Sequence, residues 1–276
     1  MIMNNRKTFK ILHYALLVIL TAFFLFPVLW VVLSSFKPQS ELFQIPIQIM
    51  PQQWTFENYI EAMSRGDFVR YFSNSLFVAV TATIITVLIS IMAGYGFSKY
   101  FFIGRDFLFM VMLATLMIPL QVIMVPIFLQ LKASGLLNTL WGIIIPPSAT
   151  PTGIFLARQY MATLPNSMIE AARIDGAGES RIFFHIILPL SKPIIATITI
   201  FSFMWRWNDY LWPLIVILDD KKQTIQQALA NFVGQLQINW SQLLAMTTVA
   251  ILPVIIIFLV FQKYFMTGIS AGAVKG

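Results

Sequence analysis

Residues 72–97 read FSNSLFVAVTATIITVLISIMAGYGF and contain no charged side chain. A helix of about 20 residues crosses the roughly 30 Å of hydrocarbon in a bilayer, so this segment is long and apolar enough to span it. Five further segments are also long and predominantly apolar: 11–35, 107–131, 140–160, 193–218 and 243–265. We therefore predict an all-α polytopic membrane protein with six transmembrane helices.

The composition supports a membrane protein and excludes several kinds of chemistry. Of the 276 residues, 58% are hydrophobic and 11% are charged, whereas a soluble domain carries about 25% charged residues. The chain has no cysteine, which excludes disulfides, thiolate metal sites and a cysteine nucleophile. Because His13 and His185 are its only histidines, we predict no metal site and no catalytic residue.

Prolines interrupt two of the predicted spans. The fourth contains Pro146, Pro147 and Pro151, and the fifth contains Pro213. In a membrane such breaks persist only where neighbouring helices or a wet cavity satisfy the freed backbone groups. The sequence therefore predicts a packed bundle around a pathway.

The distribution of Lys and Arg predicts the orientation, because cytoplasmic loops of membrane proteins are enriched in these residues. One side of the six-span scheme holds the larger set: Arg6, Lys7, Lys10, Lys99, Arg105, Arg158, Arg173, Arg181, Lys192, Lys263 and Lys275. The other side holds Lys37, Arg65, Arg70, Lys132, Lys221 and Lys222. We therefore expect both termini in the cytoplasm, and a net charge of +7 without a nucleic-acid partner. The first apolar run is too long for a cleaved signal peptide, and we interpret it as an uncleaved signal anchor.

Two outer loops, 36–71 and 219–242, are polar compared with the spans. The first is rich in Pro and Gln and carries Trp54 with charges of both signs, and the second carries several Asn and Gln side chains. Each is either a surface that meets something in the external space or an ordinary solvated loop.

The loop between the fourth and fifth spans reads LPNSMIEAARIDGAGESRIFFHIILP over residues 164–189. Ser167 followed by Glu170 predicts a capping box at the start of a helix. Glycines 176 and 178 predict its end, because glycine readily takes the left-handed conformation at a helix C-terminus. A second short helix over about 180–188 would stop at Pro189. We therefore predict two helices that project from the membrane.

The spacing within this loop is its most specific feature. It reads E-A-A, three residues, G, nine residues and I-x-L-P, and it resembles the signature of ABC importer permeases. In that family the loop is the coupling element that docks into a cleft on an ATPase subunit. The resemblance implies this role for Glu170, Ala171, Ala172, Asp175, Gly176, Ile186, Leu188 and Pro189. The alternative is that Glu170 merely caps a helix and Gly176 merely ends it.

Other fragments resemble the carbohydrate branch of these permeases, and in particular the smaller permease subunit of the maltose-type transporter. They are PVLWVVLSSFK (27–37), GYGFSKYFFIGR (94–105), WNDYLWPL (207–214) and YFMTGISAGAVKG (264–276). The resemblance implies a type I ABC importer permease fold in the bacterial cytoplasmic membrane. It also implies one permease domain over 1–276, with the coupling loop at about 161–192.

The same resemblance implies the partners. They are a second homologous permease, two ATPase subunits and an extracytoplasmic sugar-binding protein, which together import a sugar or oligosaccharide by alternating access. The loop 219–242 corresponds to one that meets the binding protein. The tail, about 266–276, corresponds to one that reaches the ATPase subunits through Gly272, Ala273, Val274, Lys275 and Gly276.

The fifth span carries polar and aromatic residues close to an apolar run. Ionisable groups at membrane depth cost at least about 2.5–3.5 kcal/mol each, so they normally face a partner or water. Arg206 and Asp209 are three residues apart and able to pair on one helical face. Candidates for a translocation path are Trp207, Asn208, Asp209 and Tyr210. The alternative is that these aromatic residues form a membrane-interface cluster and that the charged pair is structural.

No phosphate-binding G-x-x-x-x-G-K-[ST] motif occurs in the sequence. We therefore expect no cofactor in this chain, with ATP and magnesium bound by the partner ATPase subunits, and we predict a permease rather than an enzyme. Two other functions stay open on the residues alone. An ion-driven secondary transporter would need intramembrane carboxylates, for which Asp209 is a candidate. A membrane enzyme is the second, although titratable residues are scarce in the spans.

Overall fold

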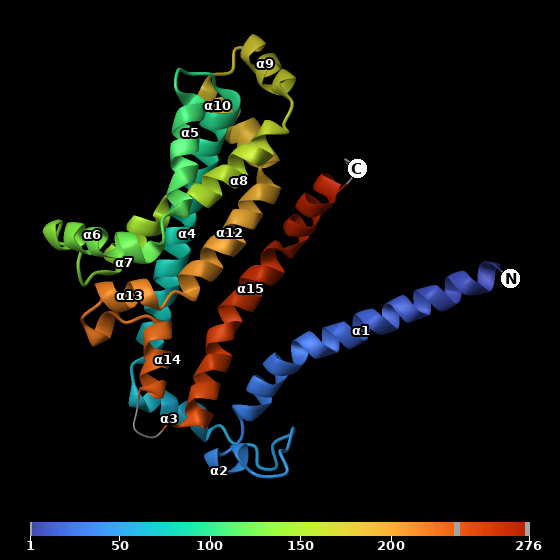
Figure 1. Ribbon diagram of the computed structural model, residues 1–276, viewed down its shortest axis with the longest axis vertical. Coiled ribbons are helices and arrows are strands. Elements are labelled where there is room, and N and C mark those ends of the chain that lie inside the picture. Colours follow the sequence, from blue (N-terminus) through green and yellow to red (C-terminus); the bar gives the residue numbers. More distant parts are fainter. Residues whose placement is uncertain (1, 235–237, 274–276) are drawn as a thin grey trace. The chain divides into compact units, whose positions relative to one another are not determined.

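The computed structural model describes residues 2–234 and 238–273 (Figure 1). All regular structure among these residues is helical, and no strand occurs in them. The chain divides into two compact units, Met1–Phe68 with Leu229–Leu252, and Val69–Ala228 with Pro253–Gly276. The single domain expected over 1–276 stays a prediction.

The first unit combines the beginning of the chain with a later segment. Its helices are α1 (Ile2–Ser34), α2 (Gln39–Leu42), α3 (Glu57–Arg65), the end of α14 (Ile225–Val233) and the start of α15 (Trp240–Ala273). The most apolar stretch of α1 has no buried residue. Because large apolar side chains cover that stretch, its surroundings must be lipid or another chain.

The second unit contains the remaining helices. They are α4 (Phe68–Lys99), α5 (Arg105–Ala114), α6 (Leu120–Ala133), α7 (Leu140–Ile144), α8 (Pro151–Ala162), α9 (Asn166–Ile174), α10 (Glu179–Ile182), α11 (Leu188–Leu190), α12 (Lys192–Trp207) and α13 (Leu211–Val216). Short 3-10 turns cover Thr115–Met117, Pro146–Ser148 and Asp220–Lys222, and a π-helical turn covers Phe183–Ile187.

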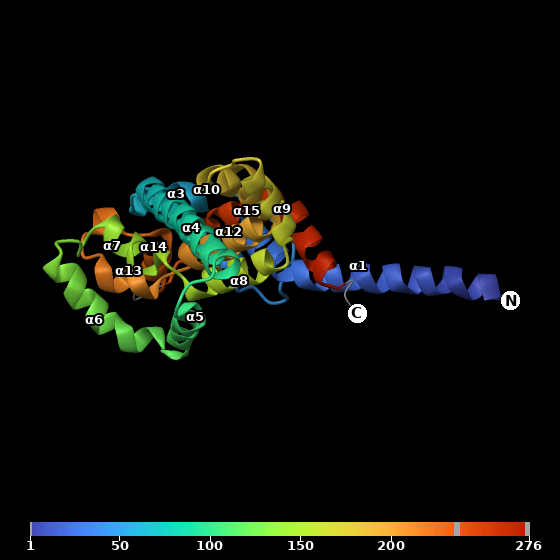
Figure 2. The same ribbon diagram turned by 90° about the horizontal axis from the view of Figure 1, so that it is seen from above.

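The helices of the structure are compatible with the six predicted spans, but the shapes of several spans differ from single helices. Within the described residues, three helices, α1, α4 and α15, are long and apolar enough to span a membrane unbroken, and there are up to six spans if each bent helix pair counts as one. The third span, predicted over 107–131, is a bent pair of helices. It bends by 103° between Arg105–Met117 and Leu120–Ala133 (Figure 2). Pro119 lies at this break. The helix is interrupted there because a proline disfavours helical conformation in the residue before it.

Of the two spans in which prolines predicted a break, one breaks at its prolines and the other does not. The fourth consists of Leu140–Ser148 and Pro151–Ala162, which meet at 42°. The fifth was predicted over 193–218, but the bent pair that is long and apolar enough to span is Glu179–Leu190 with Lys192–Trp207, and α13 is a separate short helix after residues 208–210. The expected breaks at prolines are therefore confirmed for the fourth span. In the fifth span the break precedes Pro213, which lies within the first turn of α13.

Two helices of the second unit touch through small residues. A Cβ atom on Gly94 of α4 would lie 2.5 Å from the Cβ of Ala157 in α8. One turn along each helix, a Cβ on Gly153 would lie 2.4 Å from the Oγ of Ser90. Each helix thus has two small residues four positions apart, a pattern that lets membrane helices approach closely. Larger side chains at either glycine would force α4 and α8 apart.

Candidate functional site

Helix α9 of the loop 164–190, called here the two-helix loop, starts earlier than its sequence predicts. It begins at Asn166 after Pro165, and no side chain caps it. The predicted capping box is therefore wrong, because Ser167 already lies within the first turn, past the position from which a side chain caps a helix. The Nζ of Lys99 donates to the carbonyl oxygen of Leu164 (2.6 Å) and to the Oδ1 of Asn166 (2.8 Å), which fixes where the chain enters the helix.

The turn after α9 has the geometry that the glycine predicts. Gly176 has φ +78°, in the left-handed region. The N–H of Ala177 donates to the carbonyl of Ala172 (2.9 Å), and the N–H of Gly176 donates to that of Arg173 (3.0 Å). These two bonds are the ones that close a helix in a Schellman motif. The prediction that Gly176 ends this helix is confirmed.

The second helix of the loop does not stop at Pro189. The helical conformation runs from Glu179 through a π-helical turn to Leu190, and it meets α12 at 73°. A π-helical turn changes the hydrogen-bond register, and Pro189 follows it at the start of α11, where its missing N–H costs little. The bend falls instead at Ser191, between α11 and α12.

The inner face of the two-helix loop is part of a hydrophobic core. Ile169, Ile182 and Ile187 are buried in one cluster with residues of α4, α8 and α12, among them Ile91 and Met161. Each such isoleucine stabilises the attachment by about 1.5–3 kcal/mol relative to an exposed side chain. The loop is therefore packed firmly onto the helices that bear it.

The outer face of the loop carries most of the predicted signature. Exposed residues are Glu170, Ala171, Asp175, Gly176 and Pro189, and half-buried ones are Ala172, Ile186 and Leu188. Ile174 is 86% exposed beside the glycine turn. Ile174 was not among the predicted site residues, although its sequence position already places a large apolar residue off the inward Ile169–Ala172 face. The signature thus divides between an exposed surface and the anchoring core.

Glu179 joins the two helices of the loop to the end of α4. Its Oε1 accepts a hydrogen bond from the Nε of Arg173 (2.8 Å), and its Oε2 accepts from the hydroxyl groups of Tyr100 and, at 3.4 Å, Tyr95. Burial and the bond to Glu179 raise the pKa of Tyr100, so its hydroxyl stays a donor. This group was not predicted, because its members are far apart in the chain. Figure 1 shows α9 and α10 at the end of this unit where α5 begins.

A cavity of about 250 Å³ holds the charged residues of the fifth span. Arg206 and Asp209 line it together with Trp205 and Trp212. One terminal nitrogen of Arg206 donates to the carbonyl of Pro147, in the broken fourth span, while its Nε is buried without a partner. Arg206 and Asp209 form no ion pair within 4.0 Å, so the predicted pairing is not made and both charges face the cavity.

The other predicted path residues have different surroundings. Trp207 is 1% exposed and stacks on Phe203, with ring centroids 5.8 Å apart. Asn208 and Tyr210 are exposed, and the Nδ2 of Asn208 donates to the carbonyl of Met204 (2.9 Å). Of the predicted group, Asp209 is the residue that lines the cavity, whereas Trp207 packs in the protein interior.

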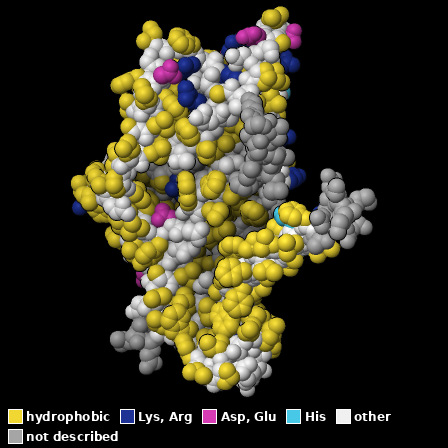
Figure 3. Space-filling view, turned by 45° about the vertical axis from the view of Figure 1, so that its right-hand side comes forward, with side chains coloured by type: hydrophobic (Ala, Val, Ile, Leu, Met, Phe, Trp, Pro, Cys, Tyr) yellow, Lys and Arg dark blue, Asp and Glu magenta, His cyan; other side chains and the backbone are white. Residues whose placement is uncertain are grey.

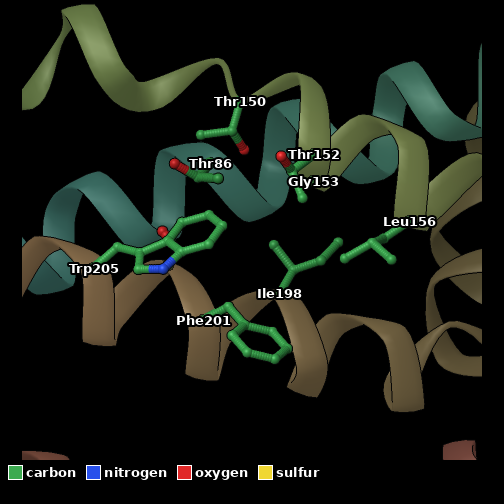
Figure 4. A pocket seen from close by; sticks show the side chains of 9 residues that line it. Thr86, Thr150, Thr152, Gly153, Leu156, Ile198, Phe201 and Trp205 are labelled. Atoms are coloured by element: carbon green, nitrogen blue, oxygen red, sulfur yellow. The ribbon is translucent and has the colours of Figure 1, made fainter. Parts of the chain in front are cut away.

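A second cavity of about 140 Å³ adjoins the first, because Thr150 and Trp205 line both. Figure 4 shows Thr86 on α4 and Thr150 and Thr152 at the start of α8, opposite Trp205 and Ile198 on α12. The hydroxyl groups of Thr86 and Ser202 are buried there without a partner in the protein. They are available to a polar group that enters the cavity.

The loop over 219–242 and the tail are described only in part. The Nδ2 of Asn74 on α4 donates to the carbonyls of Lys221 and Gln223, each at 3.0 Å, so the start of this loop is fixed. In the tail, Gly272 and Ala273 end α15. Val274, Lys275 and Gly276 lie outside the described residues, and so do Gln235, Leu236 and Gln237 of the loop.

Comparison with known proteins assigns this arrangement to a family. Residues 86–270 match the family described as binding-protein-dependent transport system inner membrane component. The chain belongs to this family. The match includes the whole two-helix loop and both cavities.

Similar permeases extend the match over almost the whole chain. The arabinooligosaccharides transport system permease protein AraQ of Bacillus subtilis (strain 168) is 38% identical over 260 residues, which cover 93% of this chain and 92% of that protein. The diacetylchitobiose uptake system permease protein NgcG of Streptomyces coelicolor is 35% identical and covers 99% and 91%. In the crystal structure of a bacterial ABC transporter involved in the import of the acidic polysaccharide alginate, one chain matches with a TM-score of 0.82 and 27% identity, over 94% of this chain and 97% of that one.

The resemblance found in the sequence is thereby confirmed. The chain is a multi-pass inner-membrane permease subunit of an ABC importer of the carbohydrate branch, with the all-helical permease fold. Because the relatives are permeases, the subunit is a transport component rather than an enzyme or an ion-driven transporter. Membership of a binding-protein-dependent system implies an ATPase and a substrate-binding protein as partners.

Proposed function

We propose that this permease carries a sugar or oligosaccharide into the cell, paired with a second, similar permease and two ATPase subunits. The names of the relatives support this class of cargo, since AraQ and NgcG serve the uptake of short sugar chains. The observation that carries the proposal is the arrangement of the two-helix loop. Its inner isoleucines are buried among the span helices, and its glycine turn is exposed.

The exposed face of the two-helix loop docks on an ATPase subunit in this proposal. Ile174 is the apolar contact, Gly176 allows the tight turn, and Glu170 and Asp175 surround them with charge. Closure of the ATPase pair then moves the loop as a rigid body together with α4, α8 and α12. The orientation follows from the Lys and Arg distribution, with the loop and both termini in the cytoplasm. Gly272–Gly276 at the C-terminus would lie on the ATPase side.

The cavity at Arg206 and Asp209 belongs to the translocation path in this proposal. A sugar hydroxyl accepts a hydrogen bond from a guanidinium N–H and donates one to a carboxylate. The flanking Trp205 and Trp212 offer apolar surface to a sugar ring. The loop 219–242 would face the sugar-binding protein. ATP and magnesium would bind to the ATPase subunits, and this chain would hold no cofactor.

Reconstituted transport tests the proposal. The permease, its partner permease, the ATPase and the binding protein are assembled in proteoliposomes, and ATP-dependent uptake of labelled oligosaccharides is measured. We expect uptake of at least one sugar, dependent on all four components. A complex that hydrolyses ATP in response to its binding protein but moves a cargo other than a sugar would overturn the proposed cargo.

Two variants separate the path from the packing of the fifth span. Asp209→Asn should raise the KM for uptake by about tenfold or more, because one hydrogen bond to a charged group contributes about 1.5–3 kcal/mol and about 1.4 kcal/mol corresponds to a factor of ten. Trp207→Phe, at a buried position, should lower thermal stability and leave the KM unchanged. If Asp209→Asn leaves the uptake kinetics unchanged, the carboxylate is structural.

A further inference from the structure

The segment of the first outer loop that follows α2 has an unusual composition. Residues 43–56 read FQIPIQIMPQQWTF and contain no charged side chain. We call them the apolar segment. They follow closely on α1 and lie beside its C-terminal end (Figure 1).

Most large apolar side chains of this segment point away from the protein. Ile45 is 94% exposed and Ile47 is 67% exposed. Other exposed members are Phe43, Ile49, Met50, Trp54 and Phe56. Soluble surfaces rarely show a contiguous apolar patch of this kind, and such patches mark contacts with proteins or membranes. Figure 3 shows a continuous run of apolar side chains along α1, directly before this loop.

Polar side chains hold the segment from the inside. The buried carboxylate of Glu41 accepts hydrogen bonds from the backbone N–H groups of Gln52 (2.8 Å) and Gln53 (3.4 Å). Just after the segment, the buried amide of Asn58 donates to the carbonyls of Ser35 and Lys37, which precede the segment, both at 2.8 Å. These two bonds hold the ends of the loop together. The exposure of the isoleucines is therefore part of a fixed structure and not the result of an unanchored chain.

Aromatic rings gather where the segment meets the two long helices of its unit. The ring of Phe36, just after α1, lies 5.6 Å from Trp54 and 5.3 Å from Phe56. The ring of Phe43 lies 6.5 Å from Trp240, the first residue of α15. Aromatic residues concentrate at the ends of membrane spans, at the level of the lipid headgroups.

We propose that the apolar segment lies in the interfacial layer of the outer leaflet, with its isoleucines among the lipid chains. The segment continues the apolar surface of α1, and its aromatic cluster marks the headgroup level. A docking surface for a transient protein partner would favour charged groups for steering, and the segment has none. The choice of the outer leaflet rests on the proposed orientation of the chain. The placement of the segment in a lipid interface does not depend on that orientation.

Site-specific photocrosslinking tests this placement. A photoreactive phenylalanine analogue replaces Ile47 in the assembled importer, in nanodiscs that contain radiolabelled phosphatidylethanolamine, with the binding protein present. The matched control carries it at Glu57, which is also exposed but lies in the charged helix α3. We expect at least fivefold more labelled lipid on the chain at position 47 than at position 57.

Equal labelling at the two positions, or crosslinks from position 47 chiefly to the binding protein or the second permease, would overturn the proposal. ATP-dependent uptake by the same samples separates this outcome from failure of the proposed function. A second measurement uses the cysteine-free sequence. A fluorophore on Ile45→Cys of the isolated full chain in nanodiscs should be quenched by lipids spin-labelled near the headgroup, and more weakly by aqueous iodide. The reverse order would also overturn the proposal.

Discussion

The two-helix loop and the first outer loop, which contains the apolar segment, both connect spans, but they differ in which side chains they bury. The two-helix loop buries isoleucines such as Ile169 and exposes charges such as Asp175. The first outer loop instead buries Lys37 and Glu41 and exposes isoleucines such as Ile45. A folded segment exposes charged and polar side chains where it faces water, and apolar side chains where it faces an apolar environment. This difference is what our two proposals require, since the two-helix loop would face water and a protein partner and the apolar segment would face lipid.

The largest effect is expected at the glycine turn. Gly176→Asp adds a Cβ to a left-handed position and a negative charge to the proposed docking face, so uptake should be abolished while membrane insertion stays normal. The matched control is Gly178→Asp, which adds the same charge two residues away at φ −69°, also without neighbours within 4 Å. Uptake assays and membrane fractionation of both variants check this. Wild-type uptake by Gly176→Asp would contradict the coupling role.

The next largest effect is expected from substituting an exposed isoleucine in each of the two regions. Ile174→Ser should lower uptake and binding-protein-stimulated ATPase activity about tenfold, because burying an isoleucine in an interface contributes about 1.5–3 kcal/mol. Ile45→Ser should leave ATPase stimulation within twofold of wild type, since its side chain contacts lipid in our proposal. Both positions are exposed, so neither change should unfold the chain. Equal effects of the two variants on ATPase stimulation would contradict the proposal that the two isoleucines contact different surroundings.

A smaller effect is expected from the group around Glu179. Glu179→Gln removes its charge-assisted bond to Arg173, an exposed pair whose contribution is about 0–1 kcal/mol. Uptake should fall about two- to fivefold while the ATPase still co-purifies with the permease. The control is Glu57→Gln, an exposed carboxylate of the first outer loop, which should have no effect. Loss of ATPase co-purification in Glu179→Gln would mean that this residue acts in docking and not in positioning.

The smallest effect on transport is expected inside the outer loop. The Nζ of Lys37 donates to the carbonyl of Gln48 and lies 5.0 Å from the ring centre of Trp30. Lys37→Met leaves that partly buried carbonyl without its donor, at a cost of about 1–3 kcal/mol at most. The melting temperature in detergent should fall by a few degrees, and uptake should stay within twofold of wild type. An unchanged melting temperature would show that this buried network adds no stability.

Local patterns predicted much of this molecule. The long apolar runs predicted the spans, because length and hydropathy alone decide whether a helix can cross a bilayer. Gly176 predicted the end of α9, because the left-handed turn depends on that one residue. The spacing of the loop signature predicted the family that residues 86–270 confirm.

What the sequence did not reveal depends on contacts between distant residues. The capping box at Ser167 was wrong because Lys99 fixes the helix start from another helix. The 103° bend depends on what surrounds Pro119, and proline alone predicts a break but not its angle. The bonds of Glu179 to tyrosines about 80 positions away leave no local pattern to read.

The close contact between α4 and α8 has a mechanical consequence. With no side chain between Gly94 and Ala157, the two helices cannot slide past each other without first separating. Because the isoleucines of the two-helix loop are packed on the same pair, we expect a push on the loop to turn both helices together, with a fulcrum near Gly94. At 1.5 Å per residue, Asn74 lies about 30 Å along α4 from that fulcrum. A turn of about 5° there would displace the far end by roughly 2.5 Å.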